Sequence, residues 1–136
     1  MDILPLTPEQ IKSDWDYFSK AIDAVVVKAD GEMTPEQVYE AAIDHRVTVF
    51  HIINEVKIGL LVLSDYEDDY TEQQVLHVDI LYLTGSHVLH VCDLLEVVAK
   101  KYDFDKLAFS STRRGWFKYL EAAGFKAAYS FSKEIV

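Results

Sequence analysis

The stretch SSTRRGWFKYLEAAGF places two adjacent arginines, Arg113 and Arg114, between three hydroxyl side chains and the start of a predicted helix. Guanidinium groups bind phosphates and carboxylates in a bidentate geometry, so the stretch could grip an anion or dock an acidic partner. It could also be an ordinary, solvated helix start. Cations near a helix N-terminus cost about 0.3–1 kcal/mol each. That cost favours a binding role for at least one of the two arginines.

A second polar group lies within a predicted strand, VLHVDILYL, residues 75–83. A carboxylate or imidazole at Asp79 or His77 could take a proton from an incoming group, directly or through water. Alternatively, both belong to a polar strand face that is covered by water or by the preceding acidic loop. Strand alternation predicts that His77, Asp79 and Leu81 share one face and that Val78, Ile80 and Tyr82 share the other.

The remaining histidines and the single cysteine favour structural roles. His87 and His90 lie three residues apart on the first turns of a predicted helix, but a metal site would need further ligands that converge on them. We therefore expect a solvated helix face and no metal site. Cys92 falls on the apolar stripe of the same helix, which predicts a reduced thiol in the core. The sequence contains neither a Gly-x-Ser-x-Gly elbow nor a phosphate-binding P-loop.

The chain is acidic, with 23 Asp and Glu residues against 13 Lys and Arg and a net charge of −10. This balance argues against nucleic-acid binding, because phosphate contacts need clustered cations. It allows basic peptides or proteins as partners; the alternative is that the charge serves solubility alone. One predicted loop would attract a basic group or form a solvated hairpin tip; it holds Asp65, Glu67, Asp68, Asp69 and Glu72.

Composition also predicts the compartment. No run of about eighteen apolar residues occurs, so we expect no membrane-spanning helix and no membrane partner. The N-terminus, MDILPLTPEQ, lacks the basic region of a signal peptide. A single cysteine allows no internal disulfide. Together these features predict a cytoplasmic protein.

The elements that must position these side chains can be predicted from turn and capping signals. The sequence TPEQ occurs twice, and each copy is a helix start with Thr as N-cap, Pro at the first position and Gln three residues after the cap. The first helix carries an apolar stripe from Ile11 to Val25, and the second runs from Pro35 to about Arg46. Strands are predicted at 2–6, 47–53, 56–65, 75–83, 106–112 and 126–136, and further helices at 86–102 and 115–123.

The resulting order is β-α-α-β-β-β-α-β-α-β. A meander of strands combined with one strand-helix-strand unit predicts an α/β fold: a single mixed sheet with helices on both faces. No linker or low-complexity segment divides the 136 residues, so a single domain over residues 1–136 is expected.

This order resembles the Gcn5-related N-acetyltransferase (GNAT) fold, in which a late helix often ends in Gly-Phe before a strand, as YLEAAGFKAAYSF does here. The stretch that contains Arg113 and Arg114 is also similar to small phage-encoded GNAT-like proteins, where Ser-Ser-x-Arg-x-Gly-Trp leads into that helix. The resemblance implies acetyl-CoA-dependent N-acetyl transfer to an amine. It places the general base on the strand that carries Asp79, and the arginines near the CoA phosphates.

The resemblance also predicts where the cofactor pyrophosphate would bind: at the turn of Thr84, Gly85, Ser86, His87 and Val88, before the central helix. The family uses a glycine-rich pattern at this place, with exposed amides at a helix N-terminus, whereas this chain keeps only Gly85. Four residues before Gly124, where the family often has a general-acid tyrosine, this chain has Leu120. We therefore expect weak acetyl-CoA binding, at tens of micromolar or worse.

The same scaffold without catalysis is the alternative hypothesis. A phage-encoded member could serve virion assembly or bind a host protein, in the host cytoplasm or on the virion, with Arg113, Arg114 and Trp116 forming the contact. The two hypotheses predict different partners: a small-molecule amine or basic peptide for the enzyme, and a protein surface for the interaction module. Acetyl-CoA binding separates them.

Overall fold

The computed structural model describes residues 1–28, 33–85, 87–109, 116–127, 133 and 135. Predictions that concern Ser86, Arg113 and Arg114, and most of the predicted last strand, lie outside these residues. The elements are β1 (Asp2–Leu6), α1 (Pro8–Ser13), α2 (Trp15–Lys28), α3 (Pro35–Ile43), β2 (Thr48–Asn54), β3 (Val56–Glu67), β4 (Gln74–Leu83), α4 (Val88–Lys101), β5 (Lys106–Phe109) and α5 (Phe117–Ala122).

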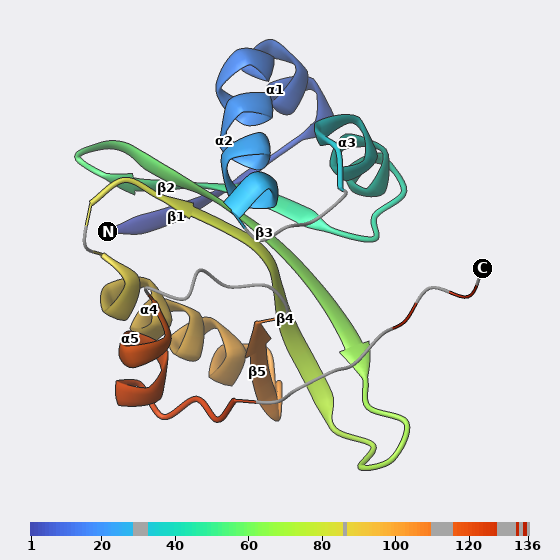
Figure 1. The fold of residues 1–136 in the computed structure, drawn as a ribbon, viewed down its shortest axis with the longest axis vertical. Coiled ribbons are helices and arrows are strands. Elements are labelled where there is room, and N and C mark those ends of the chain that lie inside the picture. Colours follow the sequence, from blue (N-terminus) through green and yellow to red (C-terminus); the bar gives the residue numbers. More distant parts are fainter. Residues whose placement is uncertain (29–32, 86, 110–115, 128–132, 134, 136) are drawn as a thin grey trace.

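The described strands form one mixed sheet in the order β1-β2-β3-β4-β5. Strands β1 to β4 pair antiparallel, and β4 pairs with β5 in parallel. The parallel pair needs a crossover, which α4 supplies. The prediction of a mixed sheet is confirmed, and β4 is an interior strand between β3 and β5, as predicted. The long β3–β4 hairpin extends beyond the rest of the sheet (Figure 1).

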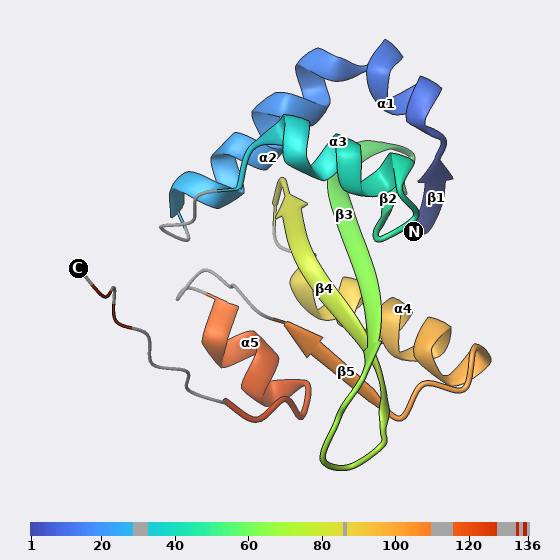
Figure 2. The ribbon, with the colours of Figure 1, turned by 90° about the vertical axis from the view of Figure 1, so that its right-hand side faces the viewer.

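Helices cover both faces of the sheet, as predicted: α1, α2 and α3 pack on one face, and α4 and α5 on the other (Figures 1 and 2). Two hydrophobic clusters result. The first, here called the α1–α3 core, contains Ile11, Phe18, Ala21, Ile22, Val25, Val38, Ala42, Val49, Leu60, Val62 and Ile80. The second, the α4–α5 core, contains Ile52, Ile58, Leu61, Leu63, Leu76, Val78, Leu81, Leu83, Val88, Val91, Cys92, Leu95, Ala99 and Leu120.

Both TPEQ capping boxes form as predicted. The Thr7 hydroxyl accepts from the Gln10 backbone N–H, and the Gln10 side chain accepts from the Thr7 backbone N–H. Thr34 and Gln37 repeat this exchange at the start of α3. The predicted first helix, however, is two helices, because Asp14 leaves helical geometry at φ −115° and ψ 34° and separates α1 from α2.

Strand β4 carries a β-bulge at Asp79. Val62 pairs with Ile80 and Leu63 pairs with Val78, so Asp79 is the extra residue. The alternation predicted along this strand was therefore wrong: Val78 belongs to the α4–α5 core and Ile80 to the α1–α3 core. A bulge adds one residue to the strand and shifts the side-chain alternation beyond it.

Candidate functional site

Three polar side chains form a cluster on the two central strands, on the face opposite α4. Ser64 of β3 pairs across the sheet with His77 of β4, and Asp79 follows at the bulge. Their neighbours Leu63, Leu76 and Val78 point into the α4–α5 core, which directs Ser64 and His77 to the other face. We call Ser64, His77 and Asp79 the bulge cluster.

The contacts within the bulge cluster converge on one carboxylate oxygen. The Ser64 hydroxyl donates to Asp79 Oδ1 at 3.1 Å, and His77 Nδ1 contacts the same oxygen. Ser64 Oγ also lies 3.5 Å from His77 Nδ1. The side chains of His77 and Asp79 are only 16% and 19% exposed, so these contacts are mostly buried but solvent can still reach them.

This geometry suits proton transfer rather than nucleophilic attack by Ser64. In a serine hydrolase the hydroxyl hydrogen-bonds to the imidazole, which then removes its proton. Here the hydroxyl of Ser64 donates to the carboxylate of Asp79 instead. The bulge cluster therefore holds an imidazole and a carboxylate in fixed contact, which is an arrangement for accepting a proton from another molecule.

One edge of β4 beside the bulge has no strand partner in the described part of the chain. The parallel pairing with β5 runs from Val75 opposite Lys106 to Val78 opposite Phe109 and stops there. Beyond it, within the described residues, β4 pairs with β3 alone, up to Leu83. In this part of the chain the backbone of β4 from Asp79 onward therefore has no strand partner on the β5 side, and its groups there can meet a bound molecule.

In the turn predicted to hold pyrophosphate, the N-terminus of α4 can bind an anion, whereas the donors of Thr84 are already used. Thr84 uses both of its donors on the carbonyl of Ile58, through its backbone N–H at 2.9 Å and its hydroxyl at 3.1 Å. Gly85 has a positive φ of 84°, and His87 caps α4 without a side-chain hydrogen bond. The 14-residue α4 has no acidic side chain in its first turn. The free backbone amides of that turn can therefore bind a phosphate at the helix N-terminus.

Within the described residues, those of α5 and its N-cap pack mainly against the α4–α5 core or face solvent. Trp116 is partly buried and packs against the α4–α5 core, whereas Phe117 is 48% exposed. Leu120 is buried in that core, and Tyr119 packs beside it with Lys118 Nζ 5.0 Å from its ring centroid. Among the described residues, no three His, Cys, Asp or Glu side chains converge as metal ligands.

Cys92 is buried in the α4–α5 core, as predicted. Burial raises the pKa of its thiol to about 11, and Asp93 adds to the shift. The thiolate is the reactive form of cysteine. Cys92 is therefore a packing residue and not a nucleophile.

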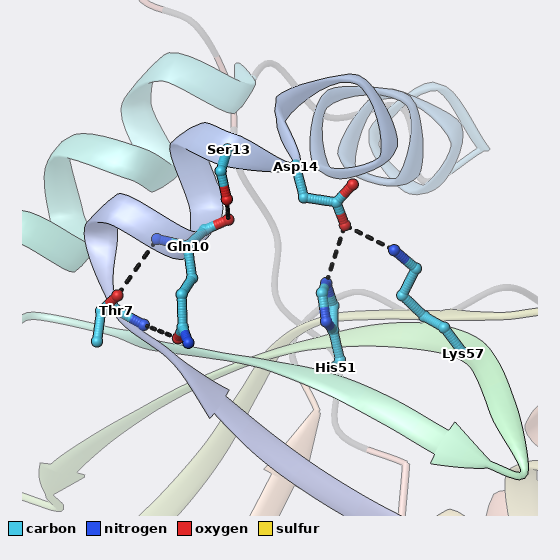
Figure 3. Close-up of polar contacts among 6 residues, drawn as sticks. All are labelled: Thr7, Gln10, Ser13, Asp14, His51 and Lys57. Carbon is cyan, nitrogen blue, oxygen red and sulfur yellow. Dashed lines mark hydrogen bonds and ion pairs between the residues drawn. The ribbon is translucent and has the colours of Figure 1, made fainter.

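A second charged cluster, which sequence patterns did not indicate, joins the α1–α2 break to the β2–β3 hairpin (Figure 3). Asp14 Oδ2 lies 2.6 Å from Lys57 Nζ and 3.4 Å from His51 Nε2. Lys57 Nζ also lies 4.0 Å from the centroid of the Tyr17 ring. We call Asp14, Tyr17, His51 and Lys57 the hairpin clamp.

Burial governs the titration of the hairpin clamp. Desolvation, then Tyr82 and Asp14, raise the pKa of Tyr17 to about 12. Desolvation and the Lys57 cation lower the pKa of His51, against the opposing pull of Asp14. Among the described side chains, Tyr17 Oη and His51 Nε2 are buried without a hydrogen bond. The clamp thus places an imidazole with a lowered pKa beside the Asp14–Lys57 ion pair.

Sequence reasoning found His77 and Asp79 but missed Ser64 and the hairpin clamp. Ser64 ends an apolar run in β3, and the register that places it opposite His77 depends on the bulge. The clamp joins residues 43 positions apart in the chain. No local signal in the sequence predicts a contact of that separation.

No protein-family model and no curated protein matches the sequence significantly. Solved structures do match the fold. A ribosomal-protein-alanine N-acetyltransferase from Brucella melitensis biovar Abortus 2308 superimposes with a TM-score of 0.66 at 17% identity, over 100% of this chain and 99% of its own. A possible acetyltransferase from Clostridium difficile 630 gives a TM-score of 0.70 at 10% identity, over 99% and 97%.

An aminoglycoside acetyltransferase from an uncultured soil metagenomic sample, solved with sisomicin, matches with a TM-score of 0.66 at 11% identity, over 99% of this chain and 96% of its own. At these identities the matches establish architecture alone. The resemblance in element order is therefore confirmed at the level of fold. The chain has the fold of the Gcn5-related N-acetyltransferases.

Proposed function

We propose that this protein is an acetyl-CoA-dependent N-acetyltransferase that acts on an amine and works as a single domain over residues 1–136. The observation that carries the proposal is the bulge cluster, an imidazole and a carboxylate in contact on an interior strand of the sheet. The matching solved structures that are named as acetyltransferases support the same chemistry.

The chemistry needs one proton acceptor and one anion site. Acetyl-CoA would supply the acetyl group as a thioester. The His77–Asp79 pair would take the proton that the attacking amine loses, which includes the predicted role of Asp79 as base. The N-terminus of α4, together with Gly85 and His87, would hold phosphate, with Ser86, Arg113 and Arg114 as further predicted contacts. From Asp79 to Thr84 the strand spans about 17 Å, which separates the reacting end from the phosphate end.

The proposed acceptor is a cationic amine, as a small molecule or on a basic peptide. Two of the matching proteins are named for amine substrates, an aminoglycoside and a ribosomal-protein alanine. The net charge of −10 would attract such cations.

The test is calorimetric titration with acetyl-CoA, followed by CoA release in the presence of a panel of amines. We expect a dissociation constant of tens of micromolar or weaker, equivalent to at most about 6–7 kcal/mol, because both donors of Thr84 are already used. Asp79→Asn should remove most of the turnover. Asp93→Asn, an exposed carboxylate on α4, is the matched control and should change nothing. Absence of both binding and turnover in the wild type would refute the proposal.

A non-catalytic interaction protein remains the second hypothesis, favoured by the occupied donors of Thr84 and by Leu120, which is buried where the family often has a tyrosine. Its predicted contact is the surface of Arg113, Arg114 and Trp116, and its proposed setting is virion assembly or host-protein binding. A wild type that binds no acetyl-CoA would favour it. Loss of a purified partner on Arg113→Ala, with acetyl-CoA binding absent throughout, would establish it.

A further inference from the structure

The bulge cluster contains two groups that could accept a proton, and their contacts differ. Asp79 Oδ1 faces the Ser64 hydroxyl and His77 Nδ1 together. An ionised carboxylate only accepts hydrogen bonds. Both neighbours therefore direct a donor at this oxygen, and its lone pairs are already engaged.

The imidazole of His77 has the complementary arrangement. A neutral imidazole carries one N–H and one acceptor nitrogen. The contact with Asp79 makes Nδ1 the donor, and Nε2 is then the acceptor. Within the described residues, Nε2 has no polar contact. The ring lies edge-to-face against Tyr66, with centroids 5.9 Å apart and planes at 61°, so it is held from a second side.

Among the described residues, the titratable groups in contact with His77 are Tyr66 on β3 and Asp79 on β4, and the polar one is Ser64. On the β5 side its register partner is Ala108, which cannot ionise. The imidazole is thus oriented by one carboxylate, as is usual for a histidine that acts as a base.

We propose that, within the proposed N-acetyl transfer, Nε2 of His77 is the atom that takes the amine proton, and that Asp79 and Ser64 are positioning residues. This inference rests on the proposed function. It changes the predicted division of roles, in which Asp79 was the base and His77 a neighbour on a polar strand face.

The step balances with acetyl-CoA as the only co-reactant. The cationic acceptor first releases one proton to solvent. The neutral amine nitrogen then attacks the thioester carbonyl carbon, the C–N bond forms and the C–S bond breaks. The sulfur leaves with the electron pair and takes a proton from solvent. The proton that the nitrogen loses passes to Nε2 of His77, which later returns it to solvent.

A first experiment needs no acceptor. Long-range proton–nitrogen NMR spectra of the histidine rings show which nitrogen carries the proton at neutral pH. We expect the Nδ1–H form for His77 in the wild type and a loss of that preference in Asp79→Ala. A wild-type ring protonated on Nε2 would overturn the inference, whatever the activity of the protein.

A second experiment compares turnover. His77→Gln should lower kcat by about 10²–10⁴-fold, the usual range for a lost general base. Asp79→Asn should cost less than His77→Gln, and Ser64→Ala least. His45→Asn is the control, because His45 is exposed and asparagine tolerates its φ of 58°.

A third readout separates a base from a structural residue. Added imidazole should restore turnover to His77→Gly. If His77→Gln keeps full turnover while Asp79→Asn is inactive, the inference fails and the proposed function stands. If the wild type neither binds acetyl-CoA nor turns over, both fail.

Discussion

At the scale of the residue, the Tyr17 hydroxyl is a cost to stability. Its oxygen is buried and makes no hydrogen bond among the described residues. A buried polar group without a partner costs about 1–3 kcal/mol. We expect Tyr17→Phe to raise the free energy of unfolding by about 1 kcal/mol in urea titrations. Tyr70→Phe is the control, since Tyr70 is 98% exposed. Destabilisation by Tyr17→Phe would show that the hydroxyl has a bound partner.

Tyr17 also predicts a pH dependence. Its pKa rises to about 12 in the folded protein because of burial, whereas an exposed tyrosine titrates near 10. The unfolded chain therefore ionises first as pH rises. The stability linked to this group is intact below about pH 10 and is lost between about pH 10 and 12. The free energy of unfolding of the wild type should therefore fall relative to that of Tyr17→Phe between about pH 10 and 12. The difference between the two should stay constant from pH 7 to 9.

His51 gives the opposite dependence. Burial and Lys57 lower its pKa, so the unfolded chain takes up the proton first as pH falls. The stability linked to His51 is present above about pH 6.5 and is lost as pH falls through the folded value. Removing the cation with Lys57→Met should raise the His51 pKa measured by NMR. Lys20→Met, which breaks only an exposed pair, should leave it unchanged.

The sequence predicted those site residues that stand out by their polar side chains. It did not predict the positions that depend on the register between β3 and β4. His77 and Asp79 are conspicuous as polar residues in an apolar strand. Their separation by one residue suggested a shared face, and their contact fits that. The positions after them were wrong, because the bulge at Asp79 moves Ile80 to the same side as His77. A bulge depends on the pairing with β3, which periodicity within β4 does not contain.

At the scale of the element, the two capping boxes allow a direct comparison. Replacing an N-cap threonine with alanine typically costs about 1 kcal/mol. We expect Thr7→Ala and Thr34→Ala each to lower the free energy of unfolding by about that amount. The two caps serve separate helices and share no partner, so the double variant should show the sum. Chemical denaturation of all three variants measures this, and a clear excess over the sum would mean that α1 and α3 are coupled.

The pairing of β3 with β4 predicts a sharp contrast between two glycines. A Cβ added at Gly59 would lie 2.2 Å from the backbone oxygen of Tyr82, whereas one at Gly124 would meet nothing within 4 Å. Gly124→Ala should cost only the strain of its positive φ of 93°, about 1–2 kcal/mol. Gly59→Ala should cost about 3 kcal/mol or more, since backbone cannot move aside as a side chain can. Thermal melts that rank the two variants the other way would contradict this register.

The elements themselves were largely predictable from local signals. The capping boxes gave the starts of α1 and α3, and the β-branched runs gave β2, β3 and β4. The break at Asp14 was missed because the apolar stripe from Ile11 to Val25 continues across it. That break lies where the Asp14 carboxylate meets Lys57 and His51, and tertiary contacts of this kind override helix periodicity.

At the scale of the whole molecule, the sheet is shared by two cores. In β3, Leu60 and Val62 belong to the α1–α3 core, and Leu61 and Leu63 belong to the α4–α5 core. Loss of either core would leave an apolar face of the same strand exposed to water. The two halves should therefore unfold together, as predicted for a single domain.

The two tryptophans can test this, because Trp15 packs against the α1–α3 core and Trp116 against the α4–α5 core. In Trp15→Phe only Trp116 reports, and in Trp116→Phe only Trp15 reports. Leu61→Ala, placed in each background, removes a fully buried side chain from the α4–α5 core alone and should cost about 2–5 kcal/mol. We expect both fluorescence transitions to shift by the same amount. If only the Trp116 signal moves to lower denaturant, the two cores unfold separately and the single-domain prediction is wrong.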